Sequence, residues 1–350
     1  MKGNYKNQLD SRRINIDKEI SRMKARLERL SPQKLSVDDE FCEVEDTNEI
    51  SINVVSSMNT GKSTFINALL QQKLMPSSNM ACTAKLIKVI DSDTSEYSMQ
   101  AFNEADRVID ERDLITYDEL SALNDDDSVA YIELTGTVPF AKNVETGISI
   151  IDTAGANNSR STIKNTFEVL ESGRGIIVCL LDANQFKFAD NDFLLRFIAN
   201  DPSTLRRTVF VINKLDQINL SQINLREKPV EKVYMDVKEY LLSMGISTKD
   251  IYPISALTAL DIRTILNRSE LDMDDDKIYD AMAQVRKVNR NIELHLEKYA
   301  PVSEKIKARI DLELKKAVAN GDRNKQALIH SGIPTVEARL VELANELANK

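Results

Sequence analysis

The stretch from Val54 to Thr64 constrains this chain more than any other. It reads VVSSMNTGKST and follows a short apolar run that begins at Ile50. It continues into FINALL, a sequence that favours a helix. A strand, a tight loop and a helix in direct succession bring backbone N–H groups and the positive end of a helix dipole to one point. Because such a point attracts anions, the stretch predicts a phosphate-binding loop.

Two side chains of this loop carry the expected chemistry. Lys62 would reach the outer phosphates of a nucleotide, and the Ser63 hydroxyl would ligate Mg²⁺. The usual pattern places a glycine where this chain has Ser56. A Gly-Lys-Ser turn that merely starts a helix is therefore a competing interpretation, and the remainder of the chain has to decide between the two.

The rest of the sequence predicts an α/β fold. Apolar runs typical of strands are expected at residues 50–55, 84–90, 129–138, 147–152, 175–181, 208–212 and 251–254. Helical patterns are expected at residues 62–73, 162–172, 191–199 and 228–244, and then at 281–299, 302–318 and 334–348. Strands that alternate with helices of this length indicate right-handed crossovers and a mainly parallel sheet. Ligands of such sheets bind at the carboxyl ends of the strands.

Two further signals complete the expected phosphate end of a site. Asp152 and Gly155 occur in an Asp-Thr-Ala-Gly turn after a buried-type strand, where a carboxylate can support Mg²⁺ and a glycine N–H can meet the terminal phosphate. Thr83 lies in a polar loop before the next strand and can add its hydroxyl to Mg²⁺. Each signal alone has an ordinary explanation, a turn for the first and a solvated loop residue for the second.

The expected base end lies after two later strands. Asn213-Lys214-Leu215-Asp216 follows the strand that ends at residue 212, and Ser255-Ala256 follows the strand at 251–254. The Asp216 carboxylate can accept from the two adjacent N–H groups of guanine, which adenine lacks. Backbone N–H groups near Ala256 could reach the guanine oxygen. Asn-Lys-x-Asp alone could be a helix cap, but all of these signals in this order favour a guanine nucleotide.

Composition narrows the function classes. The net charge of −9 argues against a dedicated nucleic-acid binder, because neutralising phosphates needs a basic surface. The 3 cysteines and 2 histidines show no metal-ligand spacing, so we expect reduced thiols, a cytoplasmic setting and no structural zinc. No apolar run approaches the roughly 20 residues of a membrane span. Contact with a membrane surface stays open.

The domain organisation follows from the two ends of the chain. Residues 1–33 are expected to hold an N-terminal helix, since Ile16, Ile20, Met23, Leu27 and Leu30 form one apolar seam. Residues 34–49 look like an acidic linker, and residues 50–350 form the main domain with a helical region at 257–350. The N-terminal seam would pack either on a helical partner missing from this chain or on the chain's own final helices.

Taken together, these motifs resemble those of a known protein family. The five signals are similar to the nucleotide-binding elements of the P-loop GTPases, and within these the chain resembles the bacterial members of the dynamin superfamily. The resemblance rests on Ser56 to Leu70, Leu74-Met75-Pro76 before Thr83, Asp152 to Ser159, Asn213 to Asp216, and Ser331-Gly332-Ile333-Pro334. It covers residues 50–350 and implies a dynamin-type G domain. In that family a helical neck and a long stalk follow, so we expect either a fragment or a reduced member.

Two positions depart from the small signalling GTPases. Ala156 follows Gly155 where those proteins carry a glutamine that orients water, so that catalytic side chain is missing. Asn59 occupies a loop position where the resemblance to cation-dependent GTPases implies a K⁺ or Na⁺ ion and a second G domain across the nucleotide. A turn residue that satisfies its own backbone is an equally good interpretation of Asn59.

We therefore expect a GTP-binding protein that hydrolyses GTP to GDP and phosphate and is activated by homodimerisation of its G domains. The alternatives are a nucleotide-gated interaction module with little turnover, and an ATPase, which Asp216 disfavours. Expected partners are GTP and GDP, a second copy, and a helical neck, stalk or protein partner; a peripheral membrane contact has no support in the sequence, and nucleic acid is not expected.

The site residues follow from these motifs. The expected catalytic residues are Lys62, Thr83 and Asn59, and the expected metal ligands are Ser63, Thr83 and Asp152. The expected nucleotide-binding residues are Ser57, Met58, Asn59, Thr60, Gly61, Lys62, Ser63, Thr64, Gly155, Asn213, Lys214, Asp216, Ser255 and Ala256.

Overall fold

The computed structural model describes residues 49–57, 59–76, 85–153, 175–187, 189–218, 229–267 and 275–349. The chain divides into two compact units, Met1–Thr47 and Asn48–Lys350, and all of the described residues belong to the second. The helix expected near the N-terminus, the acidic linker up to residue 48 and the helix expected at 162–172 lie outside the described residues.

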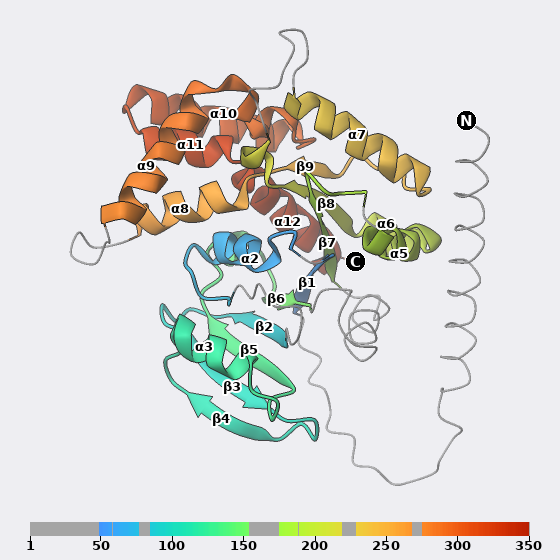
Figure 1. Cartoon of the computed structure of the whole chain (residues 1–350), viewed down its shortest axis with the longest axis vertical. Coiled ribbons are helices and arrows are strands. Elements are labelled where there is room, and N and C mark those ends of the chain that lie inside the picture. Colours follow the sequence, from blue (N-terminus) through green and yellow to red (C-terminus); the bar gives the residue numbers. More distant parts are fainter. Residues whose placement is uncertain are drawn as a thin grey trace. The chain divides into compact units, whose positions relative to one another are not determined.

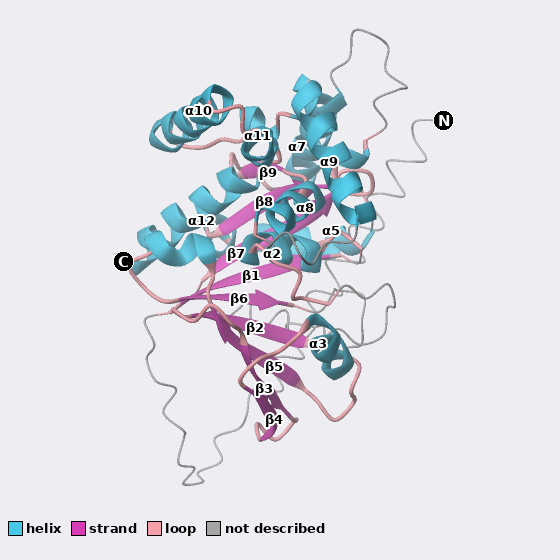
Figure 2. Cartoon of the chain, turned by 90° about the vertical axis from the view of Figure 1, so that its left-hand side faces the viewer, coloured by secondary structure: helices cyan, strands magenta, loops and turns pink. Residues whose placement is uncertain are grey.

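The described strands form one nine-stranded sheet, which Figure 2 shows as a continuous stack. Its order is β4-β3-β5-β2-β6-β1-β7-β8-β9. The strands are β1 (Ile50–Ser56), β2 (Leu86–Asp91), β3 (Ser98–Phe102), β4 (Val108–Arg112), β5 (Tyr131–Gly136), β6 (Ile148–Asp152), β7 (Ile176–Asp182), β8 (Thr208–Asn213) and β9 (Ile251–Pro253).

The centre of the sheet is parallel. β1 pairs in parallel with β6 and β7, and β8 continues the parallel arrangement from β7 to β9. Antiparallel pairs join β2 to β6 and β3 to both of its neighbours. Every residue of β7 and β8 is buried, as expected for strands covered on both faces. The predicted α/β fold with a mainly parallel sheet is confirmed, and the carboxyl ends of β1, β6, β7, β8 and β9 lie at one edge.

Helices cover both faces of this sheet. In Figure 1, α2, α8 and α12 lie on one side, and α5 and α7 lie on the other. Arg263 on α8 ties the first three together, because its guanidinium donates to Glu337 of α12 at 2.7 and 2.9 Å and also to the carbonyl of Ala68 on α2. The helices are α2 (Lys62–Leu70), α3 (Tyr117–Asn124), α5 (Ala189–Asn200), α6 (Pro202–Arg206), α7 (Pro229–Ser243), α8 (Ala256–Leu266), α9 (Asp275–Arg290), α10 (Glu304–Ala319), α11 (Arg323–His330) and α12 (Ile333–Ala348).

Between residues 91 and 145 the structure contains more strands and helices than the sequence pattern predicts. The sequence indicated one strand at 129–138, whereas the structure contains β3, β4 and α3 as well as the shorter β5. β3 is short and buries only alternate side chains, and β4 is an exposed edge strand, so neither produces a long apolar run. α3 does have a readable local signal, since Thr116 and Glu119 form a capping box at its start.

The predicted helix at 281–299 was wrong in its second half. α9 ends at Arg290, and two short 3₁₀ helices follow, η4 (Ile292–Leu294) and η5 (Leu296–Tyr299). The Asn291 side chain caps η4 by accepting from the Glu293 N–H, and the buried Leu294 and Leu296 hold this segment against the core. α11 was not predicted, although its N-cap Asp322 accepts from the Lys325 N–H.

Two other helix boundaries have clear physical causes. α2 stops at Leu70 instead of reaching residue 73, because Gln71 adopts a left-handed φ of 60°. The Asn67 side chain then accepts from the N–H groups of Leu74 and Met75 and sets the following turn. α12 contains the predicted apolar seam, and its Val336, Leu340 and Leu343 are buried in the domain's own core.

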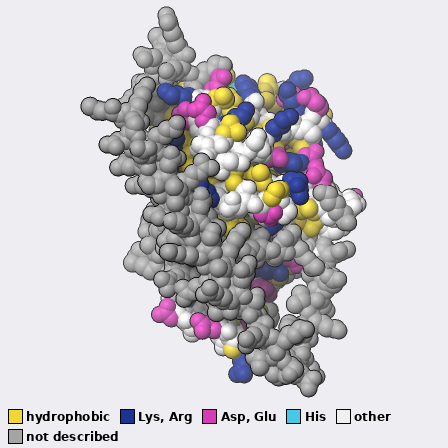
Figure 3. All heavy atoms as spheres, turned by 90° about the vertical axis from the view of Figure 1, so that its right-hand side faces the viewer, with side chains coloured by type: hydrophobic (Ala, Val, Ile, Leu, Met, Phe, Trp, Pro, Cys, Tyr) yellow, Lys and Arg dark blue, Asp and Glu magenta, His cyan; other side chains and the backbone are white. Residues whose placement is uncertain are grey.

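The surface shows mixed charge where it is described. On the face in Figure 3, the described Lys and Arg side chains lie among Asp, Glu and hydrophobic side chains. Among the described residues, no helix has both the length and the apolar character needed to cross a membrane.

Candidate functional site

The loop between β1 and α2 holds a set of backbone donors. Gly61 is the N-cap of α2 and adopts a φ of 88°, and no side chain caps the first turn of this helix. That turn also contains no acidic residue. Its amide groups and the helix dipole therefore favour an anion at this end. The Thr60 hydroxyl donates to the Ser57 carbonyl at 3.2 Å and helps to shape the loop.

Ser56 explains why the missing glycine is tolerated. It is the last residue of β1, and it is not among the described residues with a positive φ. A side chain therefore costs no backbone strain at this position. The Ser56 hydroxyl is buried and donates to the Ser57 carbonyl at 2.8 Å. The serine stabilises the loop from within.

Lys62, Ser63 and Asp152 meet at the carboxyl edge of the sheet. The Lys62 Nζ lies 2.5 Å from Asp152 Oδ1, and the Ser63 hydroxyl donates to Asp152 Oδ2 at 3.4 Å. β6 places the carboxylate here, because Asp152 stands beside Val54 in the parallel register with β1. The Lys62 and Asp152 side chains are only 12% and 9% exposed, so water screens their charges weakly. Hydroxyl and carboxylate oxygens are ligands that Mg²⁺ prefers.

Asn213, at the end of β8, connects the two halves of the site. Its amide nitrogen donates to the Thr60 carbonyl at 2.9 Å, and its side-chain oxygen accepts from the Ala256 N–H at 3.0 Å. The residue is 2% exposed. Through this one side chain the phosphate loop and the loop after β9 keep a defined separation. A direct contact between Asn213 and guanine stays a prediction.

Lys214 makes a second connection to the loop. It adopts a left-handed φ of 66°, and its Nζ lies 2.8 Å from Asp182 Oδ2 and also donates to the Asn59 carbonyl. Sequence reasoning missed Asp182, although it ends the buried strand β7 and therefore belongs to the same edge of the sheet. The stem of Lys214 is thus held across the site by a carboxylate and a loop carbonyl.

Asp216 and Ser255 form the centre of the expected base site. The Ser255 hydroxyl donates to Asp216 Oδ1 at 2.6 Å, and the Lys287 ammonium donates to the Asp216 backbone carbonyl at 2.7 Å. Asp216 is 6% exposed. A carboxylate offers about four acceptor positions, so one hydroxyl bond leaves capacity for a ligand. Asp216 lies in η2 (Leu215–Gln217), and its position is set by Ser255, the N-cap of α8, and by Lys287 of α9.

A second carboxylate adds negative charge near Asp216. Burial raises the pKa of Asp261, on α8, to about 6, and the carboxylates of Asp216 and Asp280 contribute to the rise. The local field therefore favours a ligand edge made of N–H donors and disfavours another acceptor.

The structure brings most of the predicted residues to this edge, from Ser57 and Asn59 to Ala256. Thr64 lies in the first turn of α2, on the helix that carries Lys62 and Ser63. The Asn59 side chain is exposed, and its φ of 59° agrees with a turn residue. Met58, Thr83, Gly155 and Ala156 lie outside the described residues.

Replacing Gly61 with alanine should destabilise the fold by about 2–4 kcal/mol and weaken nucleotide binding. The new Cβ would lie 2.6 Å from Asn213 Nδ2, so the Asn213 side chain would lose its bonds to Thr60 and Ala256. Gly245→Ala is the matched control. Gly245 has the same φ of 88°, but its nearest neighbour, Ala199 Cβ, is 4.0 Å away.

Chemical denaturation and nucleotide titration separate the two effects. Gly245→Ala should cost only the backbone strain of about 1–2 kcal/mol and leave nucleotide affinity unchanged. Equal losses of stability and unchanged affinity in both variants would show that the contact with Asn213 has no role in the site.

Part of the chain matches a known protein family. A family model described as the dynamin family matches residues 52–215, from β1 to the start of η2. This segment contains the phosphate loop, Asp152, Asn213 and Lys214. No curated protein sequence matches the chain significantly.

Several solved structures also align with this chain at low sequence identity. Two structures of an oligomerised bacterial dynamin pair, described as sensing and tethering membranes, have 18% and 17% sequence identity and TM-scores of 0.47 and 0.48. They match 80% and 78% of this chain, which spans 45% and 54% of theirs, about half their length. Toc33 from Arabidopsis thaliana, solved with Mg²⁺ and GMPPNP, has 12% identity and a TM-score of 0.41, and the match covers 86% of this chain and 87% of Toc33.

Proposed function

We propose that this chain, which carries a G domain of the dynamin superfamily, binds GTP with Mg²⁺ and hydrolyses it to GDP and phosphate. The observation that carries the proposal is the Asn213 side chain, which bonds to Thr60 in the phosphate loop and to Ala256 beside Asp216. A phosphate-binding end and a base-binding end are thereby held together as one site. A lone phosphate loop would need no such connection.

The residues present fit a magnesium ion. Ser63 and Asp152 supply hydroxyl and carboxylate oxygens that lie within 3.4 Å of each other, and Thr83 is the third ligand that the sequence predicts. When bound, Mg²⁺ would neutralise charge that develops on the phosphate oxygens.

Lys62 supplies the corresponding charge from the protein. Its ammonium pairs with Asp152 in this structure, and we propose that it exchanges this carboxylate for a phosphate oxygen when GTP binds. The loop amides then donate to the same phosphates and stabilise the transition state more than the ground state. Asp152, released from Lys62, becomes free to support the metal through water.

At the other end of the site, Asp216 would accept from the two adjacent N–H groups of guanine. Ser255 fixes the carboxylate by donating to Oδ1 at 2.6 Å. The Lys214 stem, held between Asp182 and the loop, would flank the base. These contacts would select GTP over ATP, because adenine lacks the two N–H donors and would leave the remaining acceptor positions of the buried Asp216 carboxylate unpaired.

A single-turnover experiment tests whether the site hydrolyses or only binds. The protein is mixed at high concentration, in excess over GTP, with Mg²⁺ and K⁺. We expect GTP to be hydrolysed and phosphate to be released. Tight GTP binding without any phosphate release would favour the second candidate, a nucleotide-gated interaction module.

Hydrolysis should depend on protein concentration and on the monovalent cation. Because Ala156 replaces the water-orienting glutamine, we propose that a second G domain and a K⁺ or Na⁺ ion at Asn59 complete the site. Turnover per molecule should then rise at least several-fold with concentration in K⁺ or Na⁺ and stay low in Li⁺. Phosphate release measured across a dilution series in the three buffers checks this.

Asn59→Gly is the sharpest variant for the cation. Glycine keeps the φ of 59° without strain and removes the whole Asn59 side chain, so the turn is preserved while a cation ligand is lost. Unchanged cation dependence in this variant would leave Asn59 as a turn residue. A turnover that is independent of both concentration and cation would contradict activation by dimerisation.

A further inference from the structure

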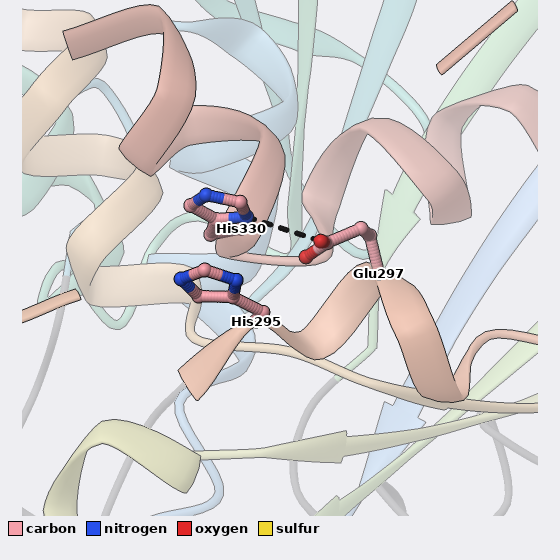
Figure 4. Close-up of side chains that lie close together, drawn as sticks. All are labelled: His295, Glu297 and His330. Atoms are coloured by element: carbon pink, nitrogen blue, oxygen red, sulfur yellow. Dashed lines mark hydrogen bonds and ion pairs between the residues drawn. The ribbon is translucent and has the colours of Figure 1, made fainter. Parts of the chain in front are cut away.

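The two histidines of this chain lie against each other in the helical region. His295 and His330 have ring centroids 3.5 Å apart and planes within 5° of parallel, as Figure 4 shows. Glu297 completes the group, with its Oε1 at 3.1 Å from His330 Nδ1. Glu297 and His330 are 33 positions apart in the chain, so only the fold brings them together.

The surrounding elements fix the backbone positions of these three residues. His295 lies between η4 and η5, Glu297 lies in η5, and His330 is the last residue of α11. Leu294 and Leu296 are 2% and 1% exposed and anchor the segment on either side of His295. The His330 and Glu297 side chains are only 6% and 7% exposed. The His330 and Glu297 side chains therefore lie in the interior, where polar atoms need partners, whereas His295 is half-buried.

Two buried atoms of the group lack such partners. Among the described residues, His295 Nε2 and Glu297 Oε2 have no hydrogen-bond partner. A buried carboxylate oxygen without a partner is destabilising, so a ligand that pairs with it would be bound favourably. The other ring nitrogen of His295, Nδ1, lies 3.2 Å from the Lys298 Nζ. Imidazole nitrogens and carboxylate oxygens are both common metal ligands in proteins.

We propose that His295, Glu297 and His330 form a binding site for a divalent transition-metal ion, with Zn²⁺ the best chemical match. One ring nitrogen from each histidine and one carboxylate oxygen already lie within 4.8 Å of one another. Metal–ligand bonds of about 2.0–2.2 Å require the two rings to turn from their parallel stack until their lone pairs converge. Two imidazoles and a carboxylate suit zinc far better than Mg²⁺, and a water would take the fourth position.

The ion would act beside the base end of the nucleotide site. Ser331, directly after His330, accepts from the Ser255 N–H at 2.9 Å, and the Ser255 hydroxyl holds Asp216. A metal that fixes the end of α11 to η5 would therefore brace the loop that we expect to read the base. This site is separate from the Mg²⁺ ligands near Lys62 and needs no hydrolysis to be detected.

Metal binding to the full chain tests the proposal. Chelator-treated protein, without nucleotide and with excess Mg²⁺, is titrated with Co²⁺ by visible absorption and with Zn²⁺ by calorimetry. We expect one ion per chain, d–d absorption typical of nitrogen and oxygen ligands, and a higher thermal unfolding midpoint with Zn²⁺. His295→Gln and Glu297→Gln should each weaken Zn²⁺ affinity by about 100-fold or more.

Glu304→Gln is the matched control, because it removes an exposed glutamate on α10 and should leave the affinity unchanged. Far-UV circular dichroism of each variant verifies that it is folded. No binding above the Mg²⁺ background would overturn the site. So would thiolate charge-transfer bands, or an affinity that His295→Gln and Glu297→Gln do not alter. In those cases the histidines form only a packed pair.

Discussion

Lys62→Ala should lower kcat/KM for GTP by about 10²- to 10³-fold. The alanine removes the ammonium that extends from the first turn of α2 to the Asp152 carboxylate at the end of β6. In the proposed mechanism this ammonium stabilises charge on the phosphates, and no described residue of the loop replaces it. The change is measured by phosphate release at saturating and subsaturating GTP, so that kcat and KM are separated.

Two control variants distinguish the loss of the Lys62 charge from other effects of the substitution. Lys325→Ala removes a lysine that is 43% exposed and lies 3.4 Å from Glu313, far along the chain on α11. It should behave as the unmodified protein does. Lys62→Met keeps most of the apolar stem and loses only the charge, so it should be as inactive as Lys62→Ala. Near-normal turnover in folded Lys62→Met would refute the assigned role.

Asp216→Asn should weaken GTP binding by about 10³-fold and improve binding of xanthosine triphosphate. Guanine presents two adjacent N–H donors, which suit two carboxylate acceptors. Xanthine presents one donor and one carbonyl acceptor, which suit the oxygen and the NH₂ group of a carboxamide. The amide is close to the carboxylate in size and can still accept from Ser255 through its oxygen. Competition of each triphosphate with labelled GTP measures the change.

Asp280→Asn separates hydrogen bonding from charge. Asp280 contributes to the raised pKa of Asp261, as Asp216 does, so the variant removes one negative charge from the same neighbourhood. It should not alter the preference among triphosphates. If ATP competes with labelled GTP as well as unlabelled GTP does, the guanine assignment is wrong and the ATPase interpretation returns.

Much of the fold could be read from local patterns. β7 and β8 are buried along their whole length, so their apolar runs stand out from any neighbouring sequence. The edge strand β4 exposes Val108 and Ile109 and contains two acidic residues, so nothing in its pattern distinguishes it from a loop. The same limit applies to the segment after Arg290, where a helical spacing of apolar residues continues into two 3₁₀ helices.

Some residues of the candidate site could likewise be predicted from the sequence, and others could not. Lys62, Ser63, Asp152 and Asp216 could be named in advance, because each lies in a short motif after an apolar strand. Asp182 carries no motif, and its pairing with Lys214 depends on the parallel register of β7 and β8. The two hydrogen bonds of the Asn213 side chain, to Thr60 and to Ala256, join three segments that are distant in the chain. No spacing in the sequence could show it.

The phosphate loop illustrates both contributions. The sequence alone determined where the loop lies and which chemistry its lysine and serine offer, because a strand, a tight turn and a helix N-terminus are local structures. Only the tertiary structure decided that Ser56 replaces glycine without strain, that Lys214 and Asn213 hold the loop, and that two distant histidines meet Glu297. Such contacts depend on strand register and helix packing, and these are properties of the whole folded chain.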